Sequence, residues 1–345
     1  MKVKAVDIAK ALGISKATVS LALNNKAGIS EETKRKVLLY KNALEQDLEP
    51  SRPNGKKLQG SVKIVIYVKH GNIIQDHKSH TGNVLPDDLE ALDRIAKKAG
   101  LSLSITYFHE KEDNINQLIM SCKDENIVGI FLVATEMLPE DFKPFRQLNV
   151  PLMIYDNDFE DLNSDNIVLN NRLAVKMGFR YLYQNGHRDI VYLNNITTIY
   201  NFTTRREAFE EFSSKLGIHA DMVEIGTKVQ EIYRNMKVYI ENGNHIPTAF
   251  FSENYVISMG VMKALQDCGY NVPNDVSLIG IDEIPSYALM DIPVTVVKVL
   301  QKNRSTIAMN RLLERINQEV DESVQFVVGP EMILGKSVRD LNHPG

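Results

Sequence analysis

The feature that most constrains the fold is an alternation of short apolar runs with longer amphipathic stretches from residue 61 to residue 345. Such runs are typical of buried strands, and the stretches between them have the period of helices. The runs expected to be strands are residues 63–68, 101–106, 127–133, 151–155, 189–193, 249–251, 276–281 and 294–299. The stretches expected to be helices are 87–99, 172–184, 204–216, 255–267 and 302–317. This alternation predicts parallel sheets with right-handed crossovers, and the length favours two α/β lobes.

The first 49 residues have a different pattern, that of three short helices. Apolar residues keep helical spacing up to Gly13, and a second such run begins after Ser15. Gly13 suits the left-handed conformation between two helices, and the Ser15 hydroxyl is expected to cap the second helix. Ser30 is expected to cap a third helix. Two helices around a glycine turn, supported by a third, follow the helix-turn-helix plan; a three-helix cap with solvated polar faces is the alternative.

Charge is divided unevenly along the chain. Residues 1–60 contain 12 Lys and Arg against 6 Asp and Glu, whereas residues 61–345 contain 28 against 38. A basic segment attached to an acidic body indicates that only the amino-terminal segment faces a polyanion such as DNA. Chance clustering of lysines is the alternative explanation.

Composition excludes several classes of protein. Hydrophobic residues make up 43% and charged residues 24% of the chain, which excludes a collagenous or wholly disordered protein. No window approaches the ~18 consecutive apolar residues of a membrane helix, and the amino terminus lacks the apolar segment of an export signal. The two cysteines, Cys122 and Cys268, cannot form a disulfide framework. We therefore expect a cytoplasmic protein with reduced thiols and no membrane partner.

Residues 6–25, VDIAKALGISKATVSLALNN, resemble the headpiece of the lactose-repressor (LacI/GalR) family of transcriptional regulators. The family pattern D-V-A-x-x-A-G-V-S-x-x-T-V-S-R-V-L-N recurs here at fixed spacing, and the resemblance implies an all-α helix-turn-helix headpiece over residues 1–49. It places Lys16 and Ala17 at base-reading positions in the major groove. The positions that would hold phosphates are Ser15, Thr18, Ser20 and Asn24. Leu21 replaces a usual Arg, so its contact would be apolar, for example with a thymine methyl group.

Residues 50–60, PSRPNGKKLQG, are rich in Pro, Gly and Lys and are interpreted as a linker. In the family this stretch is a short hinge helix that inserts a leucine into the minor groove. Leu58 is the nearest candidate for that leucine, and the lysines before it could neutralise phosphates. The match is loose, and a plain flexible tether is an equal alternative.

The resemblance continues through residues 185–193, 272–285 and 291–295. The family's regulatory domain is similar to periplasmic sugar-binding proteins, so the resemblance implies a two-lobed α/β domain over residues 61–345. That domain would bind a small-molecule effector, such as a sugar or sugar derivative, and form a homodimer. The family motifs place effector contacts at Asp156, Arg205, Asn254 and Asp282. Taken singly, each of these side chains could instead be a helix cap or part of an interlobe salt bridge.

No motif for catalysis, a metal or a cofactor accompanies this pattern. The chain has no G-x-G-x-x-G after its first strand, no P-loop and no G-x-S-x-G. His70, His77 and His80 match no standard ligand spacing. We therefore expect no cofactor, no metal and no enzyme, but a repressor that binds a palindromic operator as a homodimer and responds to an effector. The segment after the first strand departs from the family, so a regulator tuned by a protein partner, or one without an effector, stays open; a small-molecule enzyme is the weaker rival.

Overall fold

The protein is described by a computed structural model covering residues 8–9, 12, 14–23, 28–30, 33–34, 36–37, 58–71, 86–160, 164–285, 288, 290–299 and 303–343. The chain divides into two compact units, Met1–Leu58 and Gln59–Gly345. The predicted division into a headpiece (1–49), a linker (50–60) and a body (61–345) stays a prediction, because most of the linker lies outside the described residues.

The smaller unit contains helix α2, Lys16–Leu23. The Ser15 hydroxyl accepts a hydrogen bond from the Thr18 amide at 3.0 Å, as predicted for a helix cap. The Ser30 hydroxyl accepts one from the Thr33 amide at 3.2 Å in the same way. Gly13 and most of the predicted third helix lie outside the described residues. The small core of this unit consists of Ile8, Ala9, Val19, Ala22 and Val37.

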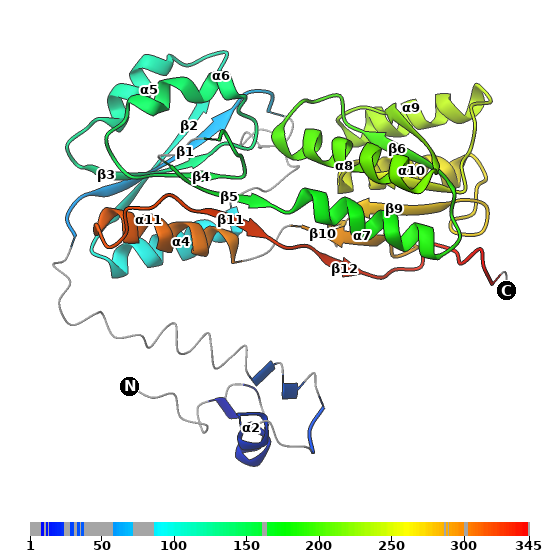
Figure 1. Ribbon diagram of the computed structural model, residues 1–345, viewed down its shortest axis with the longest axis horizontal. Helices are drawn as coiled ribbons and strands as arrows, with labels where there is room; N and C mark the ends of the chain where they lie inside the picture. The colour runs from blue at the N-terminus through cyan, green and yellow to red at the C-terminus, as the bar shows by residue number, and fades with distance from the viewer. Residues whose placement is uncertain are drawn as a thin grey trace. The chain divides into compact units, whose positions relative to one another are not determined.

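The larger unit contains two six-stranded sheets (Figure 1). In chain order, the strands of the first sheet are β1 (Ser61–Val68), β2 (Ser102–His109), β3 (Ile127–Val133), β4 (Leu152–Tyr155), β5 (Asp165–Leu169) and β11 (Gln325–Val328). Those of the second are β6 (Asp189–Asn194), β7 (His219–Glu224), β8 (Ala249–Ser252), β9 (Ser277–Ile281), β10 (Thr295–Lys298) and β12 (Glu331–Ile333). The spatial orders are β11-β5-β4-β3-β1-β2 and β12-β10-β9-β8-β6-β7.

Strand pairing is parallel throughout both sheets except between β10 and β12, which are antiparallel. The predicted parallel pairing thus holds for every described pair of strands except the one at this edge of the second sheet. The reason lies in the connection. The chain continues from β11 of the first sheet directly into β12, so β12 runs opposite to the other strands of the second sheet. The two-lobed, mainly parallel α/β architecture is confirmed.

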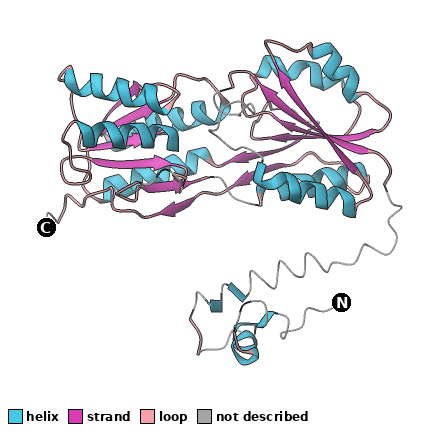
Figure 2. Cartoon of the chain, turned by 180° about the vertical axis from the view of Figure 1, so that it is seen from behind, coloured by secondary structure: helices cyan, strands magenta, loops and turns pink. Residues whose placement is uncertain are grey.

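Helices cover both faces of each sheet (Figure 2). Lobe A is the first sheet with α4 (Pro86–Lys98), α5 (Ile115–Cys122), α6 (Pro139–Phe142), the 3₁₀ helix η1 (Lys143–Gln147) and α11 (Arg304–Ile316). Lobe B is the second sheet with α7 (Asn171–Gln184), α8 (Tyr200–Leu216), α9 (Val229–Glu241) and α10 (Tyr255–Asp267). The chain passes between the lobes after β5, after β10 and after β11.

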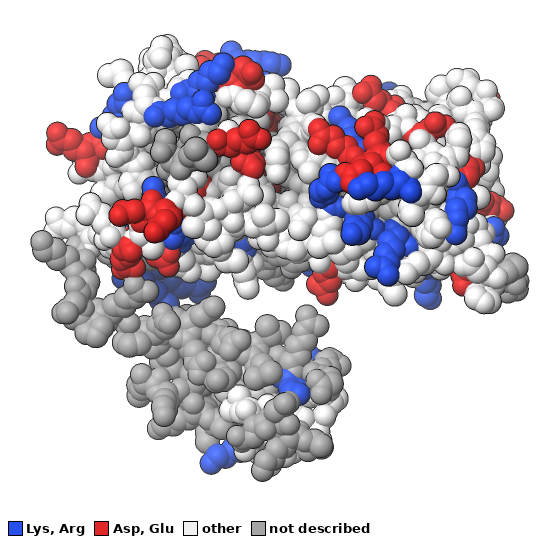
Figure 3. All heavy atoms as spheres, viewed as in Figure 1, with Lys and Arg blue, Asp and Glu red and all other residues white. Residues whose placement is uncertain are grey.

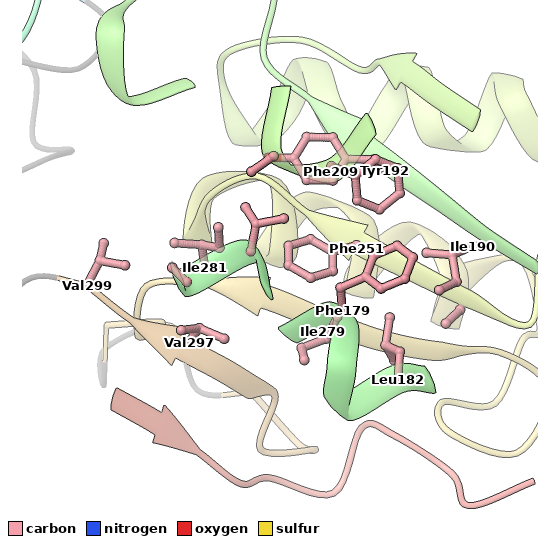
Figure 4. Packing of buried hydrophobic residues seen from close by; sticks show 14 of the residues in the cluster. Phe179, Leu182, Ile190, Tyr192, Phe209, Phe251, Ile279, Ile281, Val297 and Val299 are labelled. Carbon is pink, nitrogen blue, oxygen red and sulfur yellow. The ribbon is translucent and has the colours of Figure 1, made fainter. Parts of the chain in front are cut away.

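The core of lobe B shows how helix α7 is fixed to the sheet (Figure 4). Phe179 of α7 and Phe209 of α8 meet edge to face, with ring centroids 5.5 Å apart. Phe209 also packs against Tyr192 of β6 at 4.7 Å, and Tyr192 stacks on Phe251 of β8 at 5.4 Å. These aromatic contacts join two helices and two strands, so they fix where α8 begins relative to the ends of the strands.

The strand orders of the two lobes correspond position by position, which makes β4 and β9 equivalent. An aspartate follows each of these strands, Asp156 after β4 and Asp282 after β9. The Asp156 amide donates to the Ile167 carbonyl and the Asp282 amide to the Val297 carbonyl, both at 2.9 Å. The fold therefore places two predicted site residues at equivalent strand ends, where ligands bind in such sheets.

Candidate functional site

Helix α2 carries most of the predicted DNA contacts. Val19 and Ala22 face the core, whereas Lys16, Ala17 and Ser20 are exposed. No acidic residue lies in the first turn of α2, so the partial positive charge of its amino terminus is not opposed. The exposed side of this helix can therefore meet a phosphate at its start and base edges along its length.

The other predicted DNA contacts have different environments. The Ser15 and Thr18 hydroxyls lie 2.9 Å apart and bond to each other, and Leu21 is half-buried. Leu58, the predicted minor-groove leucine, is also half-buried. Asn24 lies outside the described residues.

In lobe A, both carboxylate oxygens of Asp156 have partners within the chain. The Arg304 guanidinium donates through Nη1 to Oδ1 at 2.5 Å, and the Thr135 hydroxyl donates to Oδ2 at 2.9 Å. Arg304 opens helix α11, donates through Nε to the Tyr155 hydroxyl at 2.9 Å and lies over the Tyr155 ring. Asp156 and Arg304 are 3% and 2% exposed, so this ion pair is almost fully removed from water.

In lobe B, the equivalent Asp282 is not fully paired. The nearest guanidinium nitrogen, Nη2 of Arg205, lies 3.9 Å from Asp282 Oδ2, which is too far for a hydrogen bond. Asp282 Oδ1 is buried and has no hydrogen-bond partner in the described part of the chain. Burial raises the pKa of Asp282, an effect that Arg205 and the Val299 amide partly oppose.

Arg205 is held in place by its two other nitrogens. Its Nε donates to Asn171 Oδ1 at 2.8 Å, and its Nη1 donates to the Glu253 carbonyl at 2.7 Å. Asn171 is in turn fixed by a hydrogen bond to Asn201 at 2.6 Å. The guanidinium therefore presents Nη2 toward Asp282 in a fixed orientation.

Asn254, the fourth predicted effector residue, caps helix α10. Its Oδ1 accepts a hydrogen bond from the Ile257 amide at 3.0 Å. The cap places Asn254 at the carboxyl end of β8, next to Glu253, whose side chain is completely buried. Arg206 and the Asn195 amide both donate to the Glu253 carboxylate, at 2.8 and 2.9 Å, which fixes the loop after β6.

The charged groups at these strand ends influence one another's ionisation across the two lobes. Asp156 and Arg304 of lobe A and Arg205 of lobe B all act on the ionisation of Asp282. At the start of α8, burial and then Asp158 raise the pKa of Tyr200, with a smaller effect from Asp156. Three of the four predicted effector residues, Asp156, Arg205 and Asp282, are thus brought within electrostatic reach of one another.

Arg304 is the residue of this cluster that the sequence analysis missed. The pattern did contain a signal: Arg304 and Arg311 lie at core-facing positions of the predicted helix over 302–317, in line with Ala308 and Leu312. An arginine at a core position needs a buried carboxylate, and Arg304 finds Asp156 while Arg311 finds Asp165 at 3.1 Å. The sequence alone does not say which carboxylate each one meets.

The remaining features to consider are metal ligands, the buried cysteine and membrane-spanning helices. Among the described residues, no three His, Cys, Asp or Glu side chains gather as ligands for a metal ion, and His77 and His80 lie outside them. Cys122 is fully buried at the end of α5, where burial raises the pKa of its thiol. The described helices include none that is both long and apolar enough to cross a bilayer.

The surface of the larger unit in Figure 3 carries basic and acidic side chains side by side over α7 and α8. Arg172 and Lys215 both pair with Glu211 there. This mixed face offers no uninterrupted positive surface for a polyanion.

Comparisons with known proteins agree with this arrangement. Residues 6–43 match the family described as bacterial regulatory proteins, lacI family, and residues 179–338 match a periplasmic binding protein-like domain. A relative from Actinobacillus pleuropneumoniae serotype 3 (strain JL03), named HTH-type transcriptional repressor PurR, is 26% identical, with 97% of this chain and 98% of the relative aligned.

Two solved structures share the fold. The lac repressor dimer bound to operator and the anti-inducer ONPF has a TM-score of 0.65 at 18% identity, covering 98% of this chain and 100% of that one. The regulator CCPA from Weissella paramesenteroides with bound glucose has a TM-score of 0.64 at 19% identity, covering 81% of this chain and 100% of that one. With both family matches in the same order as the two units, the chain belongs to the lacI family of bacterial regulatory proteins.

Proposed function

We propose that this protein is a sequence-specific DNA-binding transcriptional repressor that acts as a homodimer and responds to a small molecule bound between its lobes. The observation that carries the proposal is the joining of two parts in one chain. An amino-terminal unit matching the lacI family presents an exposed Lys16-Ala17 helix start, and the second unit is a two-lobed ligand-binding fold.

The DNA-binding role is supported by the chemistry of α2. Lysine can donate to guanine acceptors in the major groove, and the partial positive charge of a helix amino terminus attracts phosphate. The proposed base contacts are Lys16, Ala17 and Leu21, and the proposed phosphate contacts are Ser15, Thr18, Ser20 and Asn24. The proposed minor-groove contact is Leu58, which its spacing in the linker favours.

The effector role is supported by two polar groups of lobe B that lack a hydrogen-bond partner. Arg205 Nη2 and Asp282 Oδ1 have no hydrogen-bond partner among the described residues. A ligand hydroxyl can accept a hydrogen bond from Arg205 Nη2 and donate one to Asp282 Oδ1. Asn254 stands at the same edge of lobe B. The structure of CCPA with bound glucose is consistent with a sugar-like ligand.

The family points to a regulator rather than an enzyme, and a protein that binds the bacterial chromosome works in the cytoplasm. Two copies related by a two-fold axis would require a roughly palindromic operator, with half-sites about one helical turn, ~34–36 Å, apart or a multiple of it. The structure of the lac repressor dimer on its operator is an example within the same fold.

Selection of bound sites from random duplex DNA with the full-length protein tests this function. We expect enrichment of one inverted repeat after a few rounds. Enrichment of no motif, with retention of random and selected DNA equal, would contradict the proposal. Genes beside genomic matches to the motif would then indicate the class of effector.

A further inference from the structure

The two equivalent aspartates of the lobes differ in what remains free for a ligand. Both carboxylate oxygens of Asp156 already accept a hydrogen bond, Oδ1 from Arg304 and Oδ2 from the Thr135 hydroxyl. Asp282 keeps Oδ1 free. On lobe A, the Arg304 guanidinium therefore donates to the aspartate oxygen to which a ligand hydroxyl would otherwise donate.

The two arginines near these aspartates keep hydrogen-bond donors that no group of the described chain uses. Arg304 uses Nε for Tyr155 and Nη1 for Asp156, and Arg205 uses Nε for Asn171 and Nη1 for Glu253. Among the described residues, the Nη2 group of neither arginine has a hydrogen-bond partner. Each Nη2 carries two N–H donors, so the cluster offers four N–H donors beside Asp282, whose Oδ1 has no partner and whose Oδ2 has only the 3.9 Å ion pair with Arg205.

Both guanidinium groups are almost fully buried, with Arg205 at 3% and Arg304 at 2% exposure. Buried cations with unused donors favour an anionic acceptor, because charge-assisted hydrogen bonds are about twice as strong as neutral ones. Carboxylate and phosphate groups also match the planar geometry of guanidinium.

We propose that the effector is a hydroxylated acid, such as a sugar acid or sugar phosphate, whose anionic group is bound by Arg304 and Arg205 and whose hydroxyl donates to Asp282 Oδ1. Arg304 then sets the specificity for an anionic ligand. Because it pairs with Asp156, lobe A offers the ligand a guanidinium donor instead of a carboxylate acceptor. This inference rests on the proposed effector site between the lobes.

The raised pKa of Asp282 is compatible with a neighbouring anion. Burial already favours the neutral carboxyl, and a bound anion would favour it further.

The test measures binding of three hexoses, glucose, galactose and mannose, each as the neutral sugar, the uronate and the 6-phosphate. Isothermal titration calorimetry with the full-length protein gives the affinities. We expect at least one acid to bind tenfold or more tightly than its neutral parent sugar. The neutral sugar lacks a charge-assisted hydrogen bond, and such a bond contributes about 1.5–3 kcal/mol. Uronate and phosphate arms distinguish the two anionic groups.

The decisive variant is Asp156→Asn with Arg304→Met, which removes both charges of the pair together and avoids an unpaired buried ion. We expect it to lose the preference for the acid. The matched control is Asp165→Asn with Arg311→Met, a second buried ion pair that involves helix α11. Asp165 is the first residue of β5, so this pair lies at the amino ends of the strands, away from the carboxyl end of β4 that carries Asp156. The control should keep the preference, and thermal unfolding should show both variants folded.

Three outcomes would overturn the inference: neutral sugars that bind as tightly as their acids, an acid preference that survives in the Asp156/Arg304 variant, or no binding of any acid. If the protein still selects an inverted repeat from random DNA, the proposed repressor function stands while this inference fails.

Discussion

At the scale of single residues, two of the four non-glycine residues with a positive φ in the described part of the chain lie at the candidate effector site. Asp156 and Asp282 have φ values of 72° and 70°, in the left-handed region that residues other than glycine rarely adopt. The strain is held by equivalent hydrogen bonds from each amide to the neighbouring strand. Strained residues that the surrounding structure holds in place are typical of ligand sites.

The Asp156–Arg304 pair predicts a large effect on stability. Asp156→Asn preserves shape and tolerates the left-handed backbone but leaves the buried Arg304 guanidinium without a counter-charge. The free energy of unfolding should fall by about 3 kcal/mol, as expected when one partner of a buried pair is removed. Urea unfolding followed by circular dichroism measures this.

Asp282→Asn is the matched control for that experiment. Asp282 occupies the equivalent position in lobe B, but its nearest guanidinium is 3.9 Å away and burial already disfavours its charge. Its substitution should lower the free energy of unfolding by less than Asp156→Asn does, because no hydrogen bond to a guanidinium is lost. Equal losses from the two variants would show that the Asp156 pair has no special structural weight.

His187 predicts a dependence of stability on pH. Its ring is fully buried, contacts Thr248 Oγ1 at 3.0 Å and the Arg339 carbonyl at 3.1 Å, and burial lowers its pKa below the usual 6.5. Below about pH 6.5 the unfolded chain binds a proton that the folded chain does not, so stability falls as the pH decreases.

The measurement is the free energy of unfolding at several pH values between 7.5 and 5.5, for the protein and for His187→Gln; these are about one unit either side of the ordinary histidine value. The glutamine variant removes the titrating group, so its curve should be flatter over this range. Parallel curves for the two proteins would refute the assignment to His187.

The family motifs named residues that the structure places near one another, and their role in binding an effector stays a prediction. Asp156, Arg205 and Asp282 do come together, and Asn254 lies at the same strand edge as a helix cap. Arg304 could not be assigned because its partner is 148 positions away in the chain, and only the folded topology brings α11 against the end of β4.

At the scale of elements, the central strands and long helices follow from apolar periodicity. Helix α10, Tyr255–Asp267, was predicted with its observed limits, since Asn254 caps it and buried residues fill one side. Strands β5, β7, β11 and β12 and helices α5, α6 and α9 were not among the predicted elements. The missed edge strands β7, β11 and β12 are short or largely exposed, so they bury too few side chains to give a strand pattern.

The close contact of α7 with β8 predicts the effect of a small substitution. A Cβ atom at Gly178 would lie 2.6 Å from Phe251 Cε2, inside the aromatic cluster of lobe B. Gly178→Ala should lower the melting temperature and cost about 1–3 kcal/mol, the usual result of overpacking a core. Differential scanning calorimetry measures both.

Gly329→Ala is the control for this substitution. Nothing lies within 4 Å of a Cβ atom at Gly329. Its stability should change by less than about 0.5 kcal/mol. A Gly178→Ala protein as stable as the control would mean that the ring of Phe251 moves aside without cost.

At the scale of the whole molecule, function requires the effector site to influence DNA binding. The chain crosses between the lobes three times, so a ligand that binds groups from both lobes favours one lobe arrangement over others. In a dimer, that arrangement would set the spacing of the two amino-terminal units on an operator. The coupling is reciprocal: operator DNA should change effector affinity by the same factor as the effector changes operator affinity.

The central claim is that helix α2 reads DNA sequence through its exposed start. The most direct measurement is fluorescence anisotropy of the full-length protein on its selected duplex and on a scrambled duplex, at one salt concentration. The account predicts a preference of about 10³-fold or more for the selected duplex. It also predicts that Lys16→Ala weakens specific binding by about 1–3 kcal/mol while changing binding to scrambled DNA much less. Equal affinity for both duplexes, or an unchanged preference in Lys16→Ala, would contradict it.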